Sequence, residues 1–196
     1  EDGIRDYKVT GVQTCALPIF AERLREQIKS INEDILGAYF YPKDKDRRIE
    51  LYWMPIAMIA AILDVRIEDL TLVVLAHELA HGYTHLGRDI EGRAWHDASF
   101  QKTDLKIKEG LAQFYTELVM TKIAERSPGP RQAYERLLSL QSGPYLVHQT
   151  WLSESSHRIG EAVRFALIAT RNRDVGNYDQ WLKMLNEADV TLRNNK

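Results

Sequence analysis

Cysteine is nearly absent from this chain, with one residue, Cys15, in 196. It lies in Glu1–Ile19, whose letters EDGIRDYKVTGVQTCALPI look like an in-frame translation of a sequencing adapter fused to a genuine reading frame. We exclude residues 1–19 from fold reasoning as an artefactual, non-native segment, as one excludes a tag. The alternative is a natural arm of unusual sequence. Residues 20–196 contain no cysteine, so we expect neither disulfide bonds nor thiolate metal ligands there.

Long apolar runs and an excess of either charge are also missing. The longest apolar candidates, Pro55–Leu63 and Leu70–Ala76, are too short to cross a bilayer, so we expect no membrane span in this chain. The formal net charge is −2 and no basic stripe is visible, which argues against a nucleic-acid partner. Length and composition are those of an ordinary globular protein, and residues 20–196 are predicted to form a single domain.

Hydrophobic periodicity predicts a mainly α-helical fold with a small β element. Apolar residues recur at three- and four-residue steps, which is typical of amphipathic helices. The predicted helices are Phe20–Leu36, Pro55–Leu63, Glu68–Leu86, Asp104–Arg126, a short helix ending at Leu140, Ser153–Thr170 and Tyr178–Leu192. Two aromatic and β-branched runs, Ala38–Tyr41 and Ile49–Trp53, predict a hairpin of short strands around the charged turn Pro42–Arg48. Arg88–Thr103 is predicted to be a loop.

The strongest chemical signal is the run His77-Glu78-Leu79-Ala80-His81, an H-E-x-x-H pattern inside a predicted helix. Residues four apart lie on one helix face, about 6 Å apart along the axis, so both imidazoles can bind one cation. Zinc lowers the pKa of a bound water to near neutrality, and Glu78 is placed to take the proton from that water as general base. The alternative is a helix with two structural or surface histidines.

A catalytic zinc site takes three protein ligands and leaves one position open. His85 lies roughly 12 Å along the helix axis from His77, too far to share an ion, and is predicted to flank the site or line its wall. Glu109, on the second helix, is the better candidate, and Gly110 and Ala112 beside it would let this helix pack closely against the first. The alternative for Glu109 is a solvated carboxylate that complements the helix dipole.

Together, His77–His81 and the downstream run Glu109-Gly110-Leu111-Ala112 resemble the gluzincins, in particular the peptidase-MA-like branch. The metzincin pattern is excluded, because its third histidine would fall at Gly87. The resemblance covers about Ile49–Glu117. It implies a compact metallopeptidase domain with Zn²⁺ as cofactor, a glutamate such as Glu109 as third ligand, and a peptide or protein substrate.

The same resemblance raises expectations for the surroundings of the site. Ile49–Trp53, the strand before the motif helix, is expected to form an edge of the substrate cleft; the alternative is a strand that only packs the core. Thermolysin has an aspartate four residues after the ligand glutamate, where this chain has Gln113. We therefore expect the residues that orient the ligands to lie elsewhere, with Gln113 and Glu117 as candidates.

Peptide hydrolysis also needs a group that stabilises the oxyanion, which in related enzymes is a tyrosine or histidine beyond the third ligand. Tyr145, His148 and His157 are the candidates, each with a plain core or surface role as the alternative. Trp95 and His96 lie between the two ligand helices and could line a substrate pocket or anchor the loop. Anchoring is the prediction for Trp95.

These residues predict a zinc-dependent hydrolase that cleaves peptide bonds. One alternative is a metal-binding regulatory or interaction module with little or no catalytic activity. Another is hydrolysis of a non-peptide amide or ester by the same groups.

Overall fold

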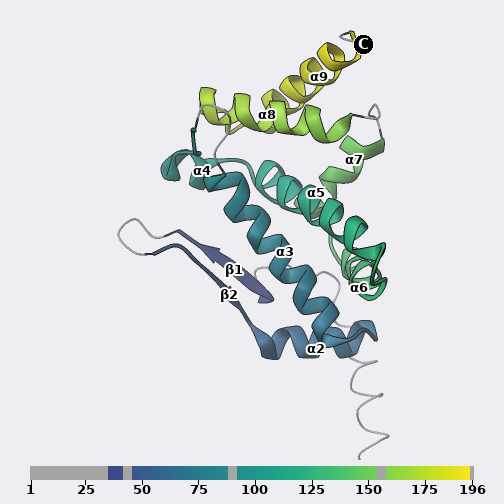
Figure 1. Cartoon of the computed structure of the whole chain (residues 1–196). Coiled ribbons are helices and arrows are strands. Elements are labelled where there is room, and N and C mark those ends of the chain that lie inside the picture. Colours follow the sequence, from purple (N-terminus) through teal and green to yellow (C-terminus); the bar gives the residue numbers. More distant parts are fainter. Residues whose placement is uncertain (1–34, 42–45, 88–91, 154–157, 195–196) are drawn as a thin grey trace, which may run out of the picture.

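The computed structural model describes residues 35–41, 46–87, 92–153 and 158–194. In chain order, the elements are β1 (Gly37–Phe40), β2 (Arg48–Leu51), α2 (Trp53–Leu63), α3 (Ile67–Leu86), α4 (Asp97–Lys102), α5 (Leu105–Ala124), α6 (Gly129–Leu138), the 3₁₀ helix η2 (Gly143–Leu146), α7 (Val147–Ser153), α8 (Ile159–Arg173) and α9 (Tyr178–Asn194) (Figure 1). The prediction of a mainly α fold with a small β element is confirmed. Residues 1–19 and the predicted helix over Phe20–Leu36, except for its last two residues, lie outside the described ranges.

The two strands form the predicted hairpin and lie along α3 (Figure 1). β1 pairs with β2 in antiparallel register, from Gly37 opposite Leu51 to Phe40 opposite Arg48. At Gly37 the strand meets the helix so closely that a Cβ would lie 2.9 Å from Cγ1 of Val74. Only glycine allows this approach, which brings β1 against the middle of α3.

The helices α3 and α5 form the central pair, and both begin where the sequence provides negative charge. Glu68 and Asp69 lie in the first turn of α3, where they complement the positive end of the helix dipole. Asp104 caps α5, and its side chain accepts a hydrogen bond from the Lys106 backbone nitrogen at 2.8 Å. The break at Ser127–Pro130 separates α5 from α6, as predicted, with Pro130 in the first turn of α6.

Two apolar clusters build the core. The first joins α2, the first half of α3 and α6, and includes Leu70, Val73 and Leu137. The second joins the first half of α5 to α7, α8 and α9, and includes Leu111 and Trp181. The second half of α5 contributes Met120 to the first cluster, so α5 crosses from one cluster to the other.

The end of α3 is held by a side chain from far along the sequence. Arg171 of α8 is nearly buried and donates to the backbone oxygens of Tyr83 at 3.0 Å and Thr84 at 2.7 Å. These carbonyls are at the C-terminal end of α3, where a cation is favourable and where helix carbonyls need partners. The contact fixes α8 to the helix that carries the H-E-x-x-H motif.

Two predicted boundaries are wrong. The predicted loop Arg88–Thr103 contains the helix α4, whose six residues are too short to show a helical period. The helix predicted from Ser153 begins at Ile159, and Ser153 ends the separate helix α7. Within the described ranges, no helix has the length and apolarity needed to cross a bilayer.

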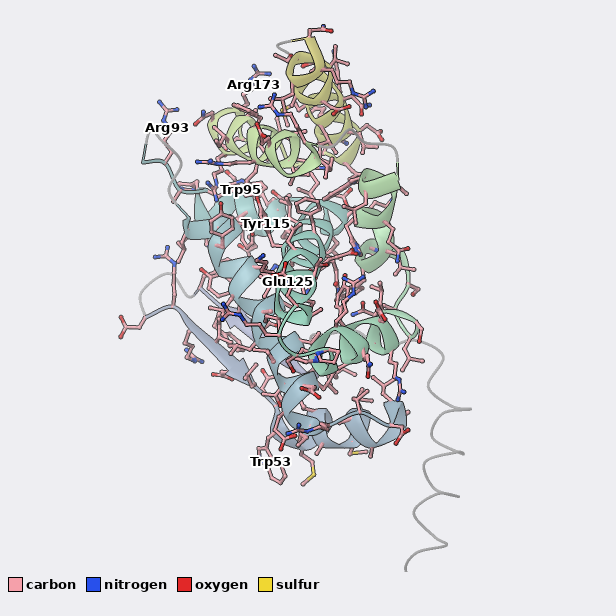
Figure 2. The ribbon with its side chains drawn as sticks, turned by 45° about the vertical axis from the view of Figure 1, so that its right-hand side comes forward. Trp53, Arg93, Trp95, Tyr115, Glu125 and Arg173 are labelled. Atoms are coloured by element: carbon pink, nitrogen blue, oxygen red, sulfur yellow. The ribbon has the colours of Figure 1, made fainter. Side chains whose placement is uncertain are left out.

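Trp53 and Trp95 have opposite environments (Figure 2). Trp53 projects into solvent from the start of α2, with 69% of its surface exposed, whereas Trp95 is 2% exposed. The Trp95 ring packs against Phe100, and its backbone nitrogen donates to the His85 oxygen at 2.8 Å. The prediction that Trp95 anchors the connection between α3 and α5 is confirmed.

Candidate metal centre

His77 and His81 lie one turn apart on the face of α3 that turns toward α5. Their Nε2 atoms are 3.0 Å apart, and the two rings meet edge to face at 86°. His77 is buried and His81 is partly buried. Helical spacing alone brings the two nitrogens to one point, as the sequence predicts.

Glu109 reaches the same point from α5. Its Oε2 atom lies 3.3 Å from Nε2 of His77 and 3.3 Å from Nε2 of His81. The side chain is buried, with 7% of the residue exposed, so the alternative of a solvated carboxylate at the helix end is wrong. Asp104 is the residue that caps α5. The three predicted ligands therefore form a single group, in which the candidate ligand atoms all lie within 4.8 Å of one another.

The spacing of the three atoms fits a tetrahedral zinc ion. Ligand atoms about 2.0–2.1 Å from such an ion lie about 3.3–3.4 Å apart along the edges of the tetrahedron. The observed separations are 3.0, 3.3 and 3.3 Å. Two imidazoles and one carboxylate are also a donor set that zinc hydrolases use. The residues present thus fit the cofactor that the sequence predicts.

The electrostatics of the group favour a carboxylate over a carboxylic acid. Burial on its own would raise the pKa of Glu109, but the His81 and His77 imidazoles beside it lower that pKa well below its ordinary value. The ionised form is the one that binds a metal cation.

Glu78 lies at the edge of this group, between α3 and the hairpin. It follows His77 directly and is 3% exposed. A Cβ on Gly37 of β1 would lie 3.2 Å from its Cγ, so β1 covers this side chain. The strand that meets the motif at Glu78 is therefore β1, whereas β2 pairs with β1 and places Leu51 against the first apolar cluster.

The three candidates for oxyanion stabilisation have different positions. Tyr145 of η2 lies beside the metal group, with its ring centre 6.3 Å from that of His77 and 9% of the residue exposed. His148 is placed against Glu117 of α5, about 12 Å along the helix axis from Glu109. His157 lies outside the described residues. Of the two described candidates, Tyr145 is the one whose ring lies beside that of a candidate ligand, His77.

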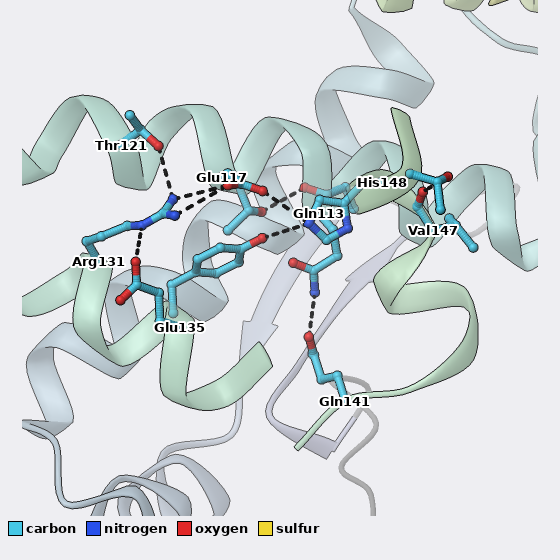
Figure 3. A network of polar contacts seen from close by, with 12 residues as sticks. Gln113, Glu117, Thr121, Arg131, Glu135, Gln141, Val147 and His148 are labelled. Carbon is cyan, nitrogen blue, oxygen red and sulfur yellow. Dashed lines mark hydrogen bonds and ion pairs between the residues drawn. The ribbon is translucent and has the colours of Figure 1, made fainter. Parts of the chain in front are cut away.

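His148 of α7 belongs to a polar network that links α5, α6 and α7 (Figure 3). Its Nε2 atom lies 3.2 Å from Oε2 of Glu117 and 3.1 Å from the Tyr134 hydroxyl. Arg131 contacts the other oxygen of Glu117 at 3.3 Å. One turn before Glu117 on α5, Gln113 donates to Oε1 of Gln141 at 3.1 Å. Both residues predicted as candidates for orienting the ligands are thus members of this network.

The predicted partner of Gly110 is wrong. A Cβ at this position would lie 2.6 Å from the Trp151 ring and 2.6 Å from Cγ2 of Val147, both on α7. Gly110 therefore allows α7, and not α3, to pack closely on α5. The error arises because the sequence shows which residues are small but not which neighbour they face. The contact still bears on the site, since Gly110 follows the candidate ligand Glu109.

His85, predicted to flank the site, lies at the centre of a buried cluster that the sequence does not reveal. Its Nδ1 is 3.1 Å from the Tyr39 hydroxyl, its Nε2 is 3.1 Å from Asp97, and its ring stacks on Phe100. Burial lowers the pKa of His85 to about 4 and raises that of Tyr39 to about 12. The neutral imidazole therefore accepts from Tyr39 and contacts Asp97, which ties β1 and α4 to α3.

A cleft of about 980 Å³ opens beside this cluster. Its walls include the stacked rings of Tyr39 and Tyr41, together with Trp95, His96 and Asp97. Trp95 and His96 thus line a cleft, and its use as a substrate pocket stays a prediction. A Cβ on Gly82, the residue after the candidate ligand His81, would lie 3.6 Å from the Tyr39 ring, so one wall residue of the cleft packs close to the candidate metal group.

Comparison with protein-family models, with curated proteins and with solved structures found no match to this chain.

Proposed function

We propose that this chain is a zinc-dependent hydrolase that cleaves peptide bonds. The observation that supports this proposal is the convergence of His77, His81 and Glu109 at separations of 3.0–3.3 Å, with Glu78 directly after the first histidine. Two nitrogens and one oxygen leave a fourth tetrahedral position for solvent, which is the arrangement of a catalytic site and not of a closed structural one.

Zinc bound there would lower the pKa of water and polarise a carbonyl group. The protein's own contribution begins with Glu78, which is buried against Gly37. We assign it the role of general base: it takes a proton from the attacking water and passes it to the nitrogen of the departing amine.

Tyr145 is the residue we assign to the oxyanion. It is the described candidate whose ring lies beside a ligand, 6.3 Å from the His77 ring between centres. A phenol donates one hydrogen bond, which is what a developing negative charge on the substrate oxygen requires. The substrate class is a peptide or protein segment, for which the cleft walled by Tyr39, Tyr41 and Trp95 offers room beyond His81.

The direct test uses the zinc-loaded protein with a library of proteome-derived peptides, with cleavage read by mass spectrometry. We expect defined cleavage products that disappear when a chelator removes the metal and return when zinc is added back. Absence of cleavage by zinc-loaded protein across the library would contradict the proposal.

A further inference from the structure

One face of α5 carries a polar residue on each of three successive turns: Glu109, Gln113 and Glu117. Four-residue spacing places them in one row along the helix. Gln113 is fully buried, and the Glu117 side chain is 21% exposed. Buried polar groups in a row are costly unless each has a partner. Glu109, the first residue of the row, belongs to the candidate metal group. The structural role of Gln113 and Glu117 follows from their partners.

Gln113 and Glu117 bind the two ends of a single segment, Gln141–His148. Gln113 donates to Oε1 of Gln141 at 3.1 Å, and Glu117 lies 3.2 Å from Nε2 of His148 (Figure 3). Gln141 is 6% exposed and His148 is fully buried. Both ends of the segment are therefore anchored to the helix that supplies the third ligand.

Between these anchors lies η2, which carries Tyr145. The 3₁₀ helix starts at Gly143, whose φ of +59° is a left-handed conformation that favours glycine. This turn leads the chain from the Gln141 anchor to Tyr145, whose ring lies beside His77. Three residues later, the chain reaches the His148 anchor.

We propose that His148 and Gln141 are positioning residues that hold Tyr145 beside the metal centre. In this arrangement α5 sets the place of the ligand Glu109 and, through Gln113 and Glu117, the place of the oxyanion donor. The inference rests on the proposed function and adds the residues on which its geometry depends. In this inference His148 positions Tyr145 and does not itself contact the substrate.

The His148 anchor is built from charge-assisted contacts. Glu117 can only accept when ionised, so Nε2 of His148 carries the hydrogen that points to it. The hydrogen bond from His148 lowers the pKa of Glu117, and the guanidinium of Arg131 contacts the same carboxylate. The Tyr134 hydroxyl lies 3.1 Å from the same histidine nitrogen, which brings α6 into the anchor. Hydrogen bonds to a charged partner are stronger and more directional than neutral ones.

The test is a double-mutant cycle on peptide cleavage by the zinc-loaded protein, with His148→Leu and Tyr145→Phe. We expect Tyr145→Phe to lower kcat about 100-fold, the usual effect of losing one oxyanion donor. His148→Leu should lower kcat at least about tenfold, with KM and zinc affinity within about threefold of wild type, and should add nothing in the Tyr145→Phe background.

Two further variants separate positioning from general loss of stability. His148→Gln keeps an amide donor near the position of Nε2 and should restore most of kcat. Arg136→Met removes a hydrogen bond from α6 to the Leu63 backbone oxygen, outside the His148 anchor, and should lower stability while leaving kcat near wild type. Loss of kcat in His148→Leu by the same factor with and without Tyr145 would overturn the inference.

A readout independent of activity uses zinc-free protein with ¹³C-labelled tyrosine. The Tyr145 resonance, assigned by its absence in Tyr145→Phe, should shift or broaden in His148→Leu and recover in His148→Gln. If the zinc-loaded wild type cleaves no peptide, the proposed function fails, and this spectrum alone decides the positioning claim. An unchanged Tyr145 resonance in folded His148→Leu would overturn it.

Discussion

Oε2 of Glu109 lies 3.3 Å from Nε2 of His77, although the two side chains come from different helices that are joined by a long connection. A carboxylate on α5 thereby joins two imidazoles on α3 to form the group of three candidate ligands. The close packing of these two helices buries the group.

Glu109→Gln tests the third ligand. The amide keeps the size of the side chain but loses the charge and most of the affinity for zinc. We expect the dissociation constant for zinc to rise by about 100-fold or more, measured by competition with a chelating dye. Asp104→Asn on the same helix is the matched control, since Asp104 caps α5 away from the metal group, and its zinc affinity should not change. Equal zinc affinity of Glu109→Gln and wild type would show that Glu109 is not a zinc ligand.

Glu78→Gln separates catalysis from metal binding. The variant should retain zinc, because Glu78 is not a ligand, and should lose peptide cleavage by about 10²–10⁴-fold, the range for removal of a general base. Metal content and cleavage rate are measured on the same preparation. A biological or binding effect that survives in this variant, with no cleavage by wild type, would favour the regulatory-module alternative. Glu125→Gln, near the end of α5 and exposed, is the control for loss of a carboxylate.

Gly110→Ala tests the contact between α5 and α7. The new Cβ would meet Trp151 and Val147 at 2.6 Å, so α5 or α7 must shift, at a cost of about 1–3 kcal/mol in unfolding free energy. Because Glu109 is adjacent, zinc affinity should fall as well. In α8, Gly160→Ala is the control: no atom lies within 4 Å of the added Cβ, and the substitution should be neutral or stabilise by up to about 1 kcal/mol. Urea unfolding with chelator present measures both.

His85 predicts a pH dependence of stability. Burial lowers its folded-state pKa to about 4, against about 6.5 in an unfolded chain. Between these values the unfolded chain binds more protons, so the stability contributed by neutral His85 is complete above about pH 6.5 and is lost as the pH falls to about 4. His85→Gln should flatten the stability profile of the zinc-free protein in this window by on the order of 2 kcal/mol. The exposed His96→Gln should follow wild type, and a His85→Gln profile as steep as wild type would contradict the assignment.

The sequence predicts the convergence of His77, His81 and Glu109, and helical spacing makes the histidine pair local. His77 and His81 need only one helix to share a cation. Glu109 begins a run of residues that is predicted to form a second helix. The fold class and the hairpin also follow from local periodicity. The helix α4 does not, because Asp97–Lys102 is shorter than two full turns and shows no period.

Contacts between distant elements are what the sequence leaves open. Gly110 is visibly small, but its contact with Trp151 depends on where α7 lies. The sequence leaves His148 open between an oxyanion donor and a core residue until Glu117 and Tyr134 are placed beside it. His85 continues the four-residue step of the motif, yet the aromatic residues that bury it come from β1, the adjoining Tyr41 and α4.

The most direct measurement is a crystal structure of the protein grown with zinc, with anomalous data collected at the zinc absorption edge. A single zinc ion is predicted about 2.0–2.2 Å from Nε2 of His77, Nε2 of His81 and a carboxylate oxygen of Glu109, with solvent in the fourth position. Crystals that contain zinc at other sites and none at this group, or an ion held there without Glu109, would contradict the account.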